Sequence, residues 1–250
     1  MMNTVKITFS PKTFINDEEE VLNLFWSYLA TLYRNGQILE NFLLLRNNDQ
    51  YISFATLPED DALDEKYNSR YTTEDLDKIK ALFAIATEQV GEDMNTGPSC
   101  ACTEKPDWYW LYTHLFDKTS PVVCGQCGHS VPLYKLPHIM GDGEYGSVQG
   151  WQGNYKAIDE LFIACFSDQY TYRQMNKLDS LLSKEGREIC QAFEEATSVP
   201  FYYYLHYYEK EPPAACPSCS EDWKLTGETS FIEYKCDKCR LVASWIDKNF

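Results

Sequence analysis

An α+β protein is the fold class that this sequence predicts, and three observations support it. The N-terminal part alternates between strand-like and helix-like hydrophobic patterns in the order β-α-β-β-α. Helical patterns then fill the middle of the chain, and two sets of closely paired cysteines stand on either side of them. We expect three domains: an N-terminal α+β domain (1–95), a central cysteine-containing and helical region (96–213), and a C-terminal cysteine module (214–250).

The N-terminal domain begins with an alternating strand over residues 4–9 and an amphipathic helix over residues 17–34. Asn16 or Asp17 caps that helix, glutamates favour its N-terminal dipole, and Gly36 ends it. One helix face carries apolar residues at helical spacing: Val21, Leu24, Phe25, Tyr28, Leu29 and Leu32. The chain therefore starts with a β-α unit that has a well-defined buried face.

A hairpin over 38–46 and 50–57 and a second helix over 73–89 complete the β-α-β-β-α order. This order is one strand short of a ferredoxin-like unit. An aromatic strand at 108–114 either supplies the missing strand or belongs to the cysteine module alone.

Beyond a linker at 91–99, the central region is predicted to be helical before it returns to strand. Its expected elements are helices over 154–166, 169–177 and 179–196, then a tyrosine-dense strand over 201–208. Aromatic residues favour strands, and a nucleic-acid stacking platform also needs a basic groove. Residues 201–213 contain one lysine and two glutamates. We therefore expect these tyrosines to pack in a sheet.

The C-terminal module contains Cys216, Cys219, Cys236 and Cys239 in the spacing C-x2-C, sixteen residues, C-x2-C. Each pair can chelate one cation from a tight turn, and the intervening residues can form a hairpin that brings the pairs together. This spacing is typical of a zinc ribbon. Four thiolates fill a tetrahedral site, which predicts a structural zinc ion rather than a catalytic one. The alternative, two redox dithiols, requires a βαβ context that the flanking strands do not provide.

A second set, Cys100, Cys102, Cys124 and Cys127, predicts a second zinc ion in a knuckle-like module. Gly125 and Gly128 suit the tight loop that such a site needs. Two alternatives stay open: four buried free cysteines, or replacement of one sulfur by His129. Cys165 and Cys190 lie in apolar helical stretches, and we expect both in the core.

The composition indicates a globular, acidic protein. The 250 residues are 44% hydrophobic and 15% aromatic, and the net charge is −16. Ten cysteines, eight of them in metal-like pairs, without a signal-peptide pattern or a long apolar run, predict a cytoplasmic protein with no membrane association. Nucleic-acid binding depends largely on Lys and Arg at phosphates. The acidic balance therefore favours a basic protein partner.

Several stretches resemble a bacterial family of unknown function whose members are described as zinc-ribbon-containing candidate nucleic-acid-binding proteins. The similar stretches run from about residue 100 to the C-terminus: Ser120-Pro-Val-Val-Cys-Gly-Gln-Cys-Gly, Val131-Pro-Leu-Tyr-Lys-Leu-Pro137, Gly186-Arg-Glu-Ile-Cys190, Pro200-Phe-Tyr-Tyr-Tyr-Leu205 and Lys235-Cys-Asp-Lys-Cys-Arg-Leu-Val242. The resemblance implies zinc at Cys216, Cys219, Cys236 and Cys239. It does not fix a function, because fold-level analogy does not determine one.

These observations predict a non-enzymatic zinc protein that engages a basic protein partner as a toxin-neutralising or adaptor module. The alternative is a nucleic-acid-binding ribbon with these contacts: Lys224, Lys235, Lys238, Arg240 and Trp245. An enzyme with an unfamiliar site is a third class, although the sequence contains no H-E-x-x-H, G-x-S-x-G or P-loop motif. Clustering of the basic residues on one face would favour nucleic acid.

Overall fold

The structure is a computed structural model, and it describes all residues except 40–41, 140, 142, 209–210, 227–231, 247–250 and the side chains of Trp245 and Ile246. The chain has a mixed α+β fold, as predicted. It divides into two compact units, a first unit (1–99, 118–120 and 129–146) and a second unit (100–117, 121–128 and 147–250). The predicted domain boundary near residue 213 falls inside the second unit.

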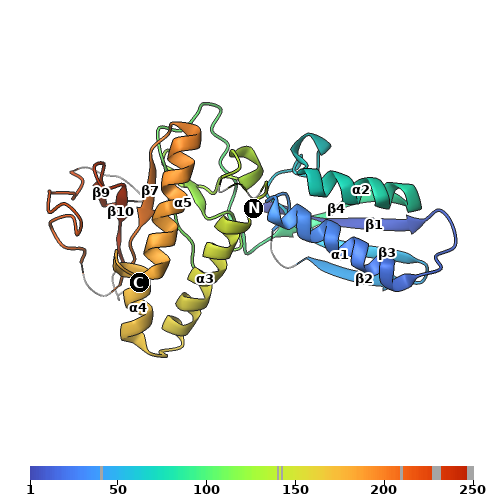
Figure 1. Cartoon of the computed structure of the whole chain (residues 1–250), viewed down its shortest axis with the longest axis horizontal. Helices are drawn as coiled ribbons and strands as arrows, with labels where there is room; N and C mark the ends of the chain where they lie inside the picture. The colour runs from blue at the N-terminus through green and yellow to red at the C-terminus, as the bar shows by residue number, and fades with distance from the viewer. Residues whose placement is uncertain (40–41, 140, 142, 209–210, 227–231, 247–250) are drawn as a thin grey trace. The chain divides into compact units, whose positions relative to one another are not determined.

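The first unit is built on a four-stranded antiparallel sheet with the strand order β2-β3-β1-β4 (Figure 1). Two helices pack their apolar faces against this sheet. In chain order the elements are β1 (Met2–Pro11), α1 (Glu18–Arg34), β2 (Leu43–Asn47), β3 (Gln50–Leu57), the 3-10 turn η1 (Glu65–Tyr67), α2 (Arg70–Leu82), β4 (Phe83–Asp93) and the 3-10 turn η2 (Leu133–Lys135).

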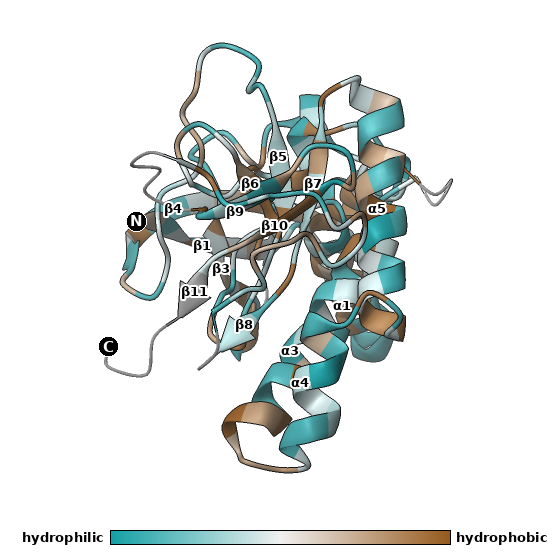
Figure 2. Cartoon of the chain, turned by 90° about the vertical axis from the view of Figure 1, so that its left-hand side faces the viewer, coloured by the Kyte–Doolittle hydropathy of each residue, from teal (hydrophilic) through white to brown (hydrophobic). Residues whose placement is uncertain are grey.

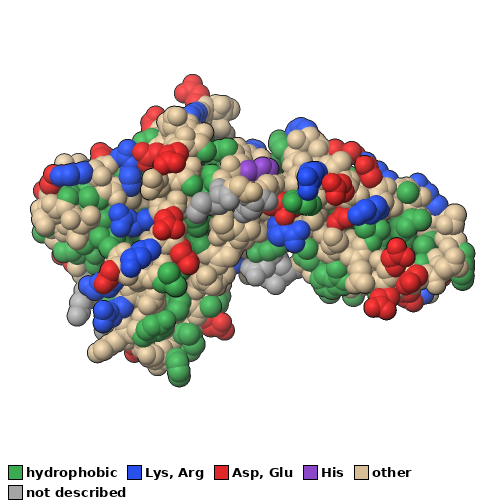
Figure 3. Space-filling view, viewed as in Figure 1, with side chains coloured by type: hydrophobic (Ala, Val, Ile, Leu, Met, Phe, Trp, Pro, Cys, Tyr) green, Lys and Arg blue, Asp and Glu red, His purple; other side chains and the backbone are tan. Residues whose placement is uncertain are grey.

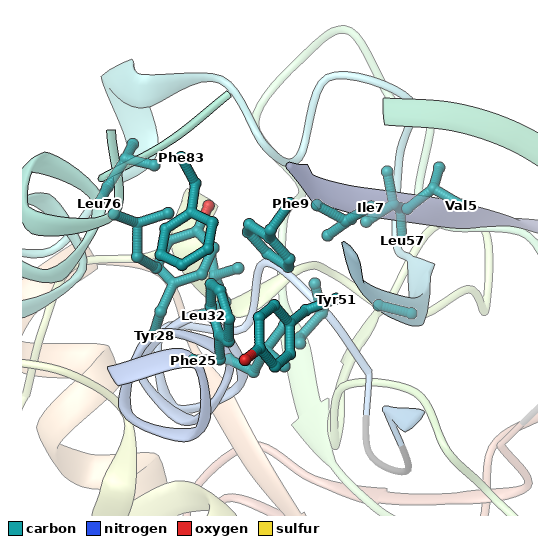
Figure 4. Packing of buried hydrophobic residues seen from close by; sticks show 14 of the residues in the cluster. Val5, Ile7, Phe9, Phe25, Tyr28, Leu32, Tyr51, Leu57, Leu76 and Phe83 are labelled. Atoms are coloured by element: carbon teal, nitrogen blue, oxygen red, sulfur yellow. The ribbon is translucent and has the colours of Figure 1, made fainter. Parts of the chain in front are cut away.

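The core of the first unit is rich in aromatic rings (Figure 4). Phe25 of α1 lies at its centre, with ring centroids 4.5 Å from Phe9, 5.0 Å from Tyr51 and 4.9 Å from Phe83. These rings come from β1, β3 and the start of β4. The helix begins as predicted, because the Asp17 carboxylate accepts a hydrogen bond from the N–H of Glu20 at 3.0 Å.

The predicted second helix is too long. It ends at Leu82, and residues 83–89 form part of β4 instead. Alanine, glutamate and glutamine in this stretch favour a helix. However, β4 pairs with β1 along the whole strand, from Met2↔Asp93 to Pro11↔Phe83. That ladder outweighs a weak local preference. β4 thus completes a β-α-β-β-α-β order and takes in residues 91–93 of the predicted linker.

The second unit contains a five-stranded sheet with the order β6-β5-β7-β10-β9 and a small pair, β11-β8. The aromatic strand near residue 110 is β5, so it belongs to this sheet and not to the first. The elements are β5 (Tyr109–Leu111), β6 (Val122–Cys124), α3 (Gly146–Ile163), α4 (Asp168–Asn176), α5 (Leu181–Thr197), β7 (Phe201–Tyr204), β8 (Tyr207–Tyr208), β9 (Tyr234–Cys236), β10 (Leu241–Ala243) and β11 (Trp245–Ile246).

Helix α5 packs closely on β7, and Gly186 permits this approach. A Cβ at Gly186 would lie 2.3 Å from Cε2 of Tyr203 and 2.8 Å from Nε1 of Trp151. Such distances are shorter than any van der Waals contact, so a side chain at this position would push the helix from the sheet. The three tyrosines of β7 are all buried, as predicted for a packed sheet.

The two remaining cysteines differ in their surroundings. Cys190 is buried, as predicted. The prediction for Cys165 is wrong, because its side chain is exposed. Helix α3 ends at Ile163, and Cys165 lies in the turn before α4 with a left-handed φ of 54°. The helical spacing that would have turned Cys165 inward therefore ends before it. Within the described part of the chain, no helix has the length and apolar composition needed to cross a membrane.

Candidate metal centres

Both predicted sets of cysteines come together in the second unit. In each set, the four Sγ atoms lie within 4.8 Å of one another. We call the set of Cys100, Cys102, Cys124 and Cys127 the first centre and the set of Cys216, Cys219, Cys236 and Cys239 the second centre. Among the described residues, His129 is in neither set. Each centre could hold one metal ion.

The sulfur spacing is that of a tetrahedral metal site. Sγ of Cys102 lies 3.9 Å from Sγ of Cys124, and Sγ of Cys219 lies 3.7 Å from Sγ of Cys236. A zinc ion with four sulfurs at about 2.3 Å gives tetrahedron edges of about 3.8 Å. A disulfide would bring the sulfurs to about 2.05 Å. All ten cysteines are free thiols, so both centres have the dimensions of a four-sulfur cation site.

A left-handed residue follows the last cysteine of each C-x2-C pair. Gly128, Ser220 and Arg240 have φ values of 73°, 63° and 53°. The N–H of Gly128 donates to the carbonyl of Cys124 at 3.0 Å, and the N–H of Ser220 donates to that of Cys216 at 2.9 Å. The chain thus curls so that both sulfurs of a pair face one point. Glycine is the expected residue for this conformation only in the first centre.

Gly125 has a different role from the one expected. A Cβ there would lie 2.3 Å from Cε2 of Trp108, whose ring lies across this glycine. The N–H of Gly125 also donates to the carbonyl of Trp108 at 2.9 Å. The absence of a side chain at Gly125 therefore allows this turn to pack on Trp108, the residue before β5. The left-handed residue of the turn is Gly128.

The two centres lie at opposite edges of one sheet. Cys124 is the last residue of β6, and Cys236 is the last residue of β9; these are the two edge strands. Each strand has three residues and few ladder hydrogen bonds of its own. Edge strands need such anchoring, since one side of each is unpaired. A metal ion at each centre would fix both edges.

Burial makes isolated thiolates unfavourable in these centres. It raises the pKa of Cys236 to about 12 and raises that of Cys100 above its usual range. The backbone N–H of Glu221 lowers the pKa of Cys219 instead. The thiols of Cys100 and Cys236 would thus stay protonated at neutral pH in the absence of a counter-charge. A divalent cation stabilises the thiolates and displaces those protons, so this chemistry suits a bound metal.

The basic residues predicted to contact nucleic acid are each paired with a carboxylate. The pairs are Lys224–Glu211 at 2.7 Å, Lys235–Asp237 at 2.9 Å, Lys238–Glu221 at 2.6 Å and Arg240–Glu194 at 2.8 Å. Trp245 begins β11, and its side chain lies outside the described residues. The four cations therefore do not form a patch of uncompensated charge.

Lys235 also covers aromatic rings of the sheet. Its Nζ atom lies 4.7 Å from the ring centroid of Tyr202 and 5.0 Å from that of Trp108. Arg240 covers the same tyrosine at 5.5 Å. Tyr202 is only 2% exposed. Its ring is thus unavailable for stacking on a base, and the two cations are already used in cation–π contacts.

Comparisons with known proteins place the chain in a family. Three families, each described as a domain of unknown function, match successive parts: DUF8589 over residues 2–90, DUF2310 over 103–206 and DUF8594 over 207–247. Two uncharacterized proteins of Haemophilus influenzae are similar to it. One is 32% identical and covers 84% of this chain and 86% of its own length. The chain belongs to the same family. The other relative is 34% identical and covers 62% of this chain and 80% of its own length.

These families carry no description of a zinc ribbon or of nucleic-acid binding, so they add no support to either prediction. Among solved structures, SnoaB, a cofactor-independent oxygenase from Streptomyces nogalater, is 16% identical and covers 37% of this chain and 94% of its own, with a TM-score of 0.31. Rv0793 from Mycobacterium tuberculosis gives a TM-score of 0.30 with 16% identity, 37% of this chain and 95% of its own. Similarity at this level carries no argument about activity.

Proposed function

We propose that this protein is a non-enzymatic zinc protein that binds another protein through its acidic surface. Zinc is the ion that best suits both centres, because four cysteine sulfurs at tetrahedral spacing are its usual structural ligand set. A site with four protein ligands has no open position for a substrate or an activated water. The zinc ions would then stabilise the fold and take no part in a reaction.

The pairing of the ribbon cations is the observation that carries the choice of partner. A protein that binds a phosphate backbone gains affinity by releasing counterions from unpaired Lys and Arg. Here Lys224, Lys238 and Arg240 would first have to leave Glu211, Glu221 and Glu194. On the face that Figure 3 shows, acidic and basic side chains alternate. Together with a net charge of −16, this favours a basic protein partner.

The alternative function is nucleic-acid binding at the ribbon, and a mobility-shift assay separates the two. We expect dissociation constants for generic DNA or RNA no better than about 10⁻⁴ M at physiological salt, the weak end of non-specific binding. A shift at sub-micromolar protein would overturn the protein-partner proposal.

The partner itself is tested by capture of the tagged chain from its native host, followed by mass spectrometry. The extract is treated with nuclease in one arm and left untreated in the other. A basic protein retained in both arms supports an adaptor or toxin-neutralising role. Loss of every bound protein after nuclease treatment would contradict it and favour the alternative.

We also infer a ferredoxin-like fold for the first unit. The β-α-β-β-α-β order and the strand order β2-β3-β1-β4 support this assignment. Its sheet and helices form a core without any of the clustered cysteines. The first unit would therefore keep its fold when metal is removed.

A further inference from the structure

A cavity of about 700 Å³ lies in the second unit, away from both sets of clustered cysteines. It is bordered by the end of α3, the start of α4, β8 and the segment that follows β5. Pockets that bind small molecules have volumes of about 300–1,000 Å³ and mostly apolar walls with a few polar groups. This cavity has the size of such a pocket, and its chemistry is specific enough to indicate a ligand class.

Four aromatic rings form one side of the cavity. The His206 ring stacks on Tyr208 with a centroid distance of 6.4 Å and an interplanar angle of 14°. The ring of Phe162 lies 6.1 Å from that of His206 and 5.7 Å from that of Tyr208, both edge-on. Tyr172 adds a fourth ring 6.0 Å from Phe162. Ring faces arranged around one space attract cations through the electron density of their π systems.

The charged side chains in the described lining of the cavity are two carboxylates. Asp159 is only 7% exposed and lines the cavity together with Asp168. Its Oδ2 accepts from the N–H of Leu115 at 2.7 Å, which holds the carboxylate in place. No Lys or Arg is among the described residues of the lining. An anionic ligand would find no counter-charge there, whereas a cation would find one.

His206 adds an acceptor that the protein leaves unused. Its Nε2 atom is buried and has no hydrogen-bond partner in the described part of the chain. Burial lowers the pKa of this histidine, with the charge of Asp159 opposing the effect, so a neutral ring is favoured at neutral pH. A neutral imidazole offers one acceptor nitrogen. Buried polar atoms without a partner are rare, and they indicate a missing water or ligand.

The mouth of the cavity is apolar and conformationally strained. Ile163 and Phe116 line the cavity yet are 52% and 69% exposed. The turn between α3 and α4 appears as the brown segment that joins these helices in Figure 2, and apolar side chains gather at the lower end of this unit in Figure 3. In that turn, Cys165 and Ser167 both have φ of 54°. Strain of this kind is often found at ligand clamps.

We propose that this cavity binds a small organic cation, namely a protonated amine on an apolar or aromatic body. The ammonium group lies among the aromatic rings near Asp159 and donates a hydrogen bond to the imidazole of His206. The apolar body extends to the mouth beside Ile163 and Phe116. The site needs no metal and is independent of the protein-binding role proposed above.

Three probes of matched shape test the charge preference: 4-phenylbutylamine, 4-phenylbutanol and 4-phenylbutyrate. Binding to the full chain is measured by calorimetry and by the NMR shifts of the His206 ring. We expect the amine to bind at least about tenfold more tightly than the alcohol, as cation–π and carboxylate contacts imply, and the carboxylate not to bind. Equal binding of amine and alcohol, or no binding of the amine, would overturn the proposal.

Asp159→Asn keeps an acceptor for Leu115 and removes the charge. It should weaken amine binding about tenfold and leave alcohol binding unchanged. Glu160→Gln is the matched control, because Glu160 is the next residue of α3 and does not line the cavity. If Asp159→Asn does not fold, Asp168→Asn and Tyr208→Leu replace it, and each should weaken the amine more than the alcohol. Unchanged amine binding in all of the folded variants contradicts the proposed site.

Discussion

Replacement of Cys236 by serine should destabilise β7 in the middle of the second unit's sheet, not only the C-terminal ribbon. Cys236 ends β9, which pairs with β10, and β10 pairs with β7 in the middle of the sheet. A structural zinc site contributes on the order of 10 kcal/mol or more to folding. Loss of one ligand should remove a large part of this, on the order of 5 kcal/mol, which is comparable to the total stability of many domains.

Hydrogen exchange read by mass spectrometry measures this effect segment by segment. A loss on the order of 5 kcal/mol lowers protection by about three to four orders of magnitude. We expect that loss in β9, β10 and β7, because the three strands are neighbours in one sheet and Tyr202 and Tyr204 of β7 share an apolar cluster with Val242 of β10. Protection in the first unit should be unchanged, since its core is separate.

Cys165→Ser is the matched control, because the same atom is replaced in an exposed thiol outside both centres. It should leave exchange unchanged throughout the chain. Loss of protection confined to residues beyond 213 would refute the reasoning from the shared sheet and restore an independent ribbon. Unchanged protection everywhere would show that Cys236 is not a ligand.

Three further predictions follow from the centres and the packing. Metal analysis of protein purified without added metal should give two zinc ions per chain, and the Cys124→Ser variant should give one. A ratio of one in the unaltered chain would show that the first centre does not bind zinc. In urea unfolding, Gly186→Ala should destabilise the protein by about 1–3 kcal/mol through overpacking. Gly153→Ala has open space around it and should stabilise the protein by up to about 1 kcal/mol. Equal effects of the two substitutions would refute the close approach of α5 to β7. The N–H of Asn95 lowers the pKa of Asp93, so this carboxylate stabilises the fold above its unfolded pKa and the contribution is lost as pH falls through the lower folded value. Asp93→Asn should therefore reduce stability at pH 7 by about 1 kcal/mol, and this difference should shrink as the pH falls through the lowered folded pKa. A constant difference would contradict this.

Local signals predicted the first helix and the second hairpin strand well, because caps and periodicity are properties of short segments. The first hairpin strand was predicted over 38–46, whereas β2 is Leu43–Asn47. Asp17 and the apolar spacing that follows it are sufficient to define α1. β4 could not be predicted in this way. Its residues favour a helix, and only the ladder with β1 makes them a strand. The prediction that Cys165 is buried was wrong because α3 ends at Ile163, so the helical spacing no longer sets the direction of the Cys165 side chain.

The metal centres were predictable from spacing, since a C-x2-C pair fixes the geometry of two sulfurs within one turn. Their position in the fold was not predictable. Serine and arginine do not favour a left-handed backbone, so the turns at Ser220 and Arg240 have no signal in the sequence. The union of the aromatic strand and the ribbon in one sheet depends on parallel pairs, β5 with β7 and β7 with β10, between distant segments. The cavity around His206 likewise joins segments from four parts of the chain.

This shared sheet changes how the metals and the acidic surface relate. If the ribbon were a separate module, its lysines would be free to turn toward a polyanion. In the sheet, Arg240 is held by Glu194 of α5, and Lys235 lies over Tyr202 of β7. The fold of the second unit thus uses these cations in its own stability. These salt bridges and cation–π contacts would have to break before the side chains could neutralise phosphates, which lowers the affinity expected for a nucleic acid.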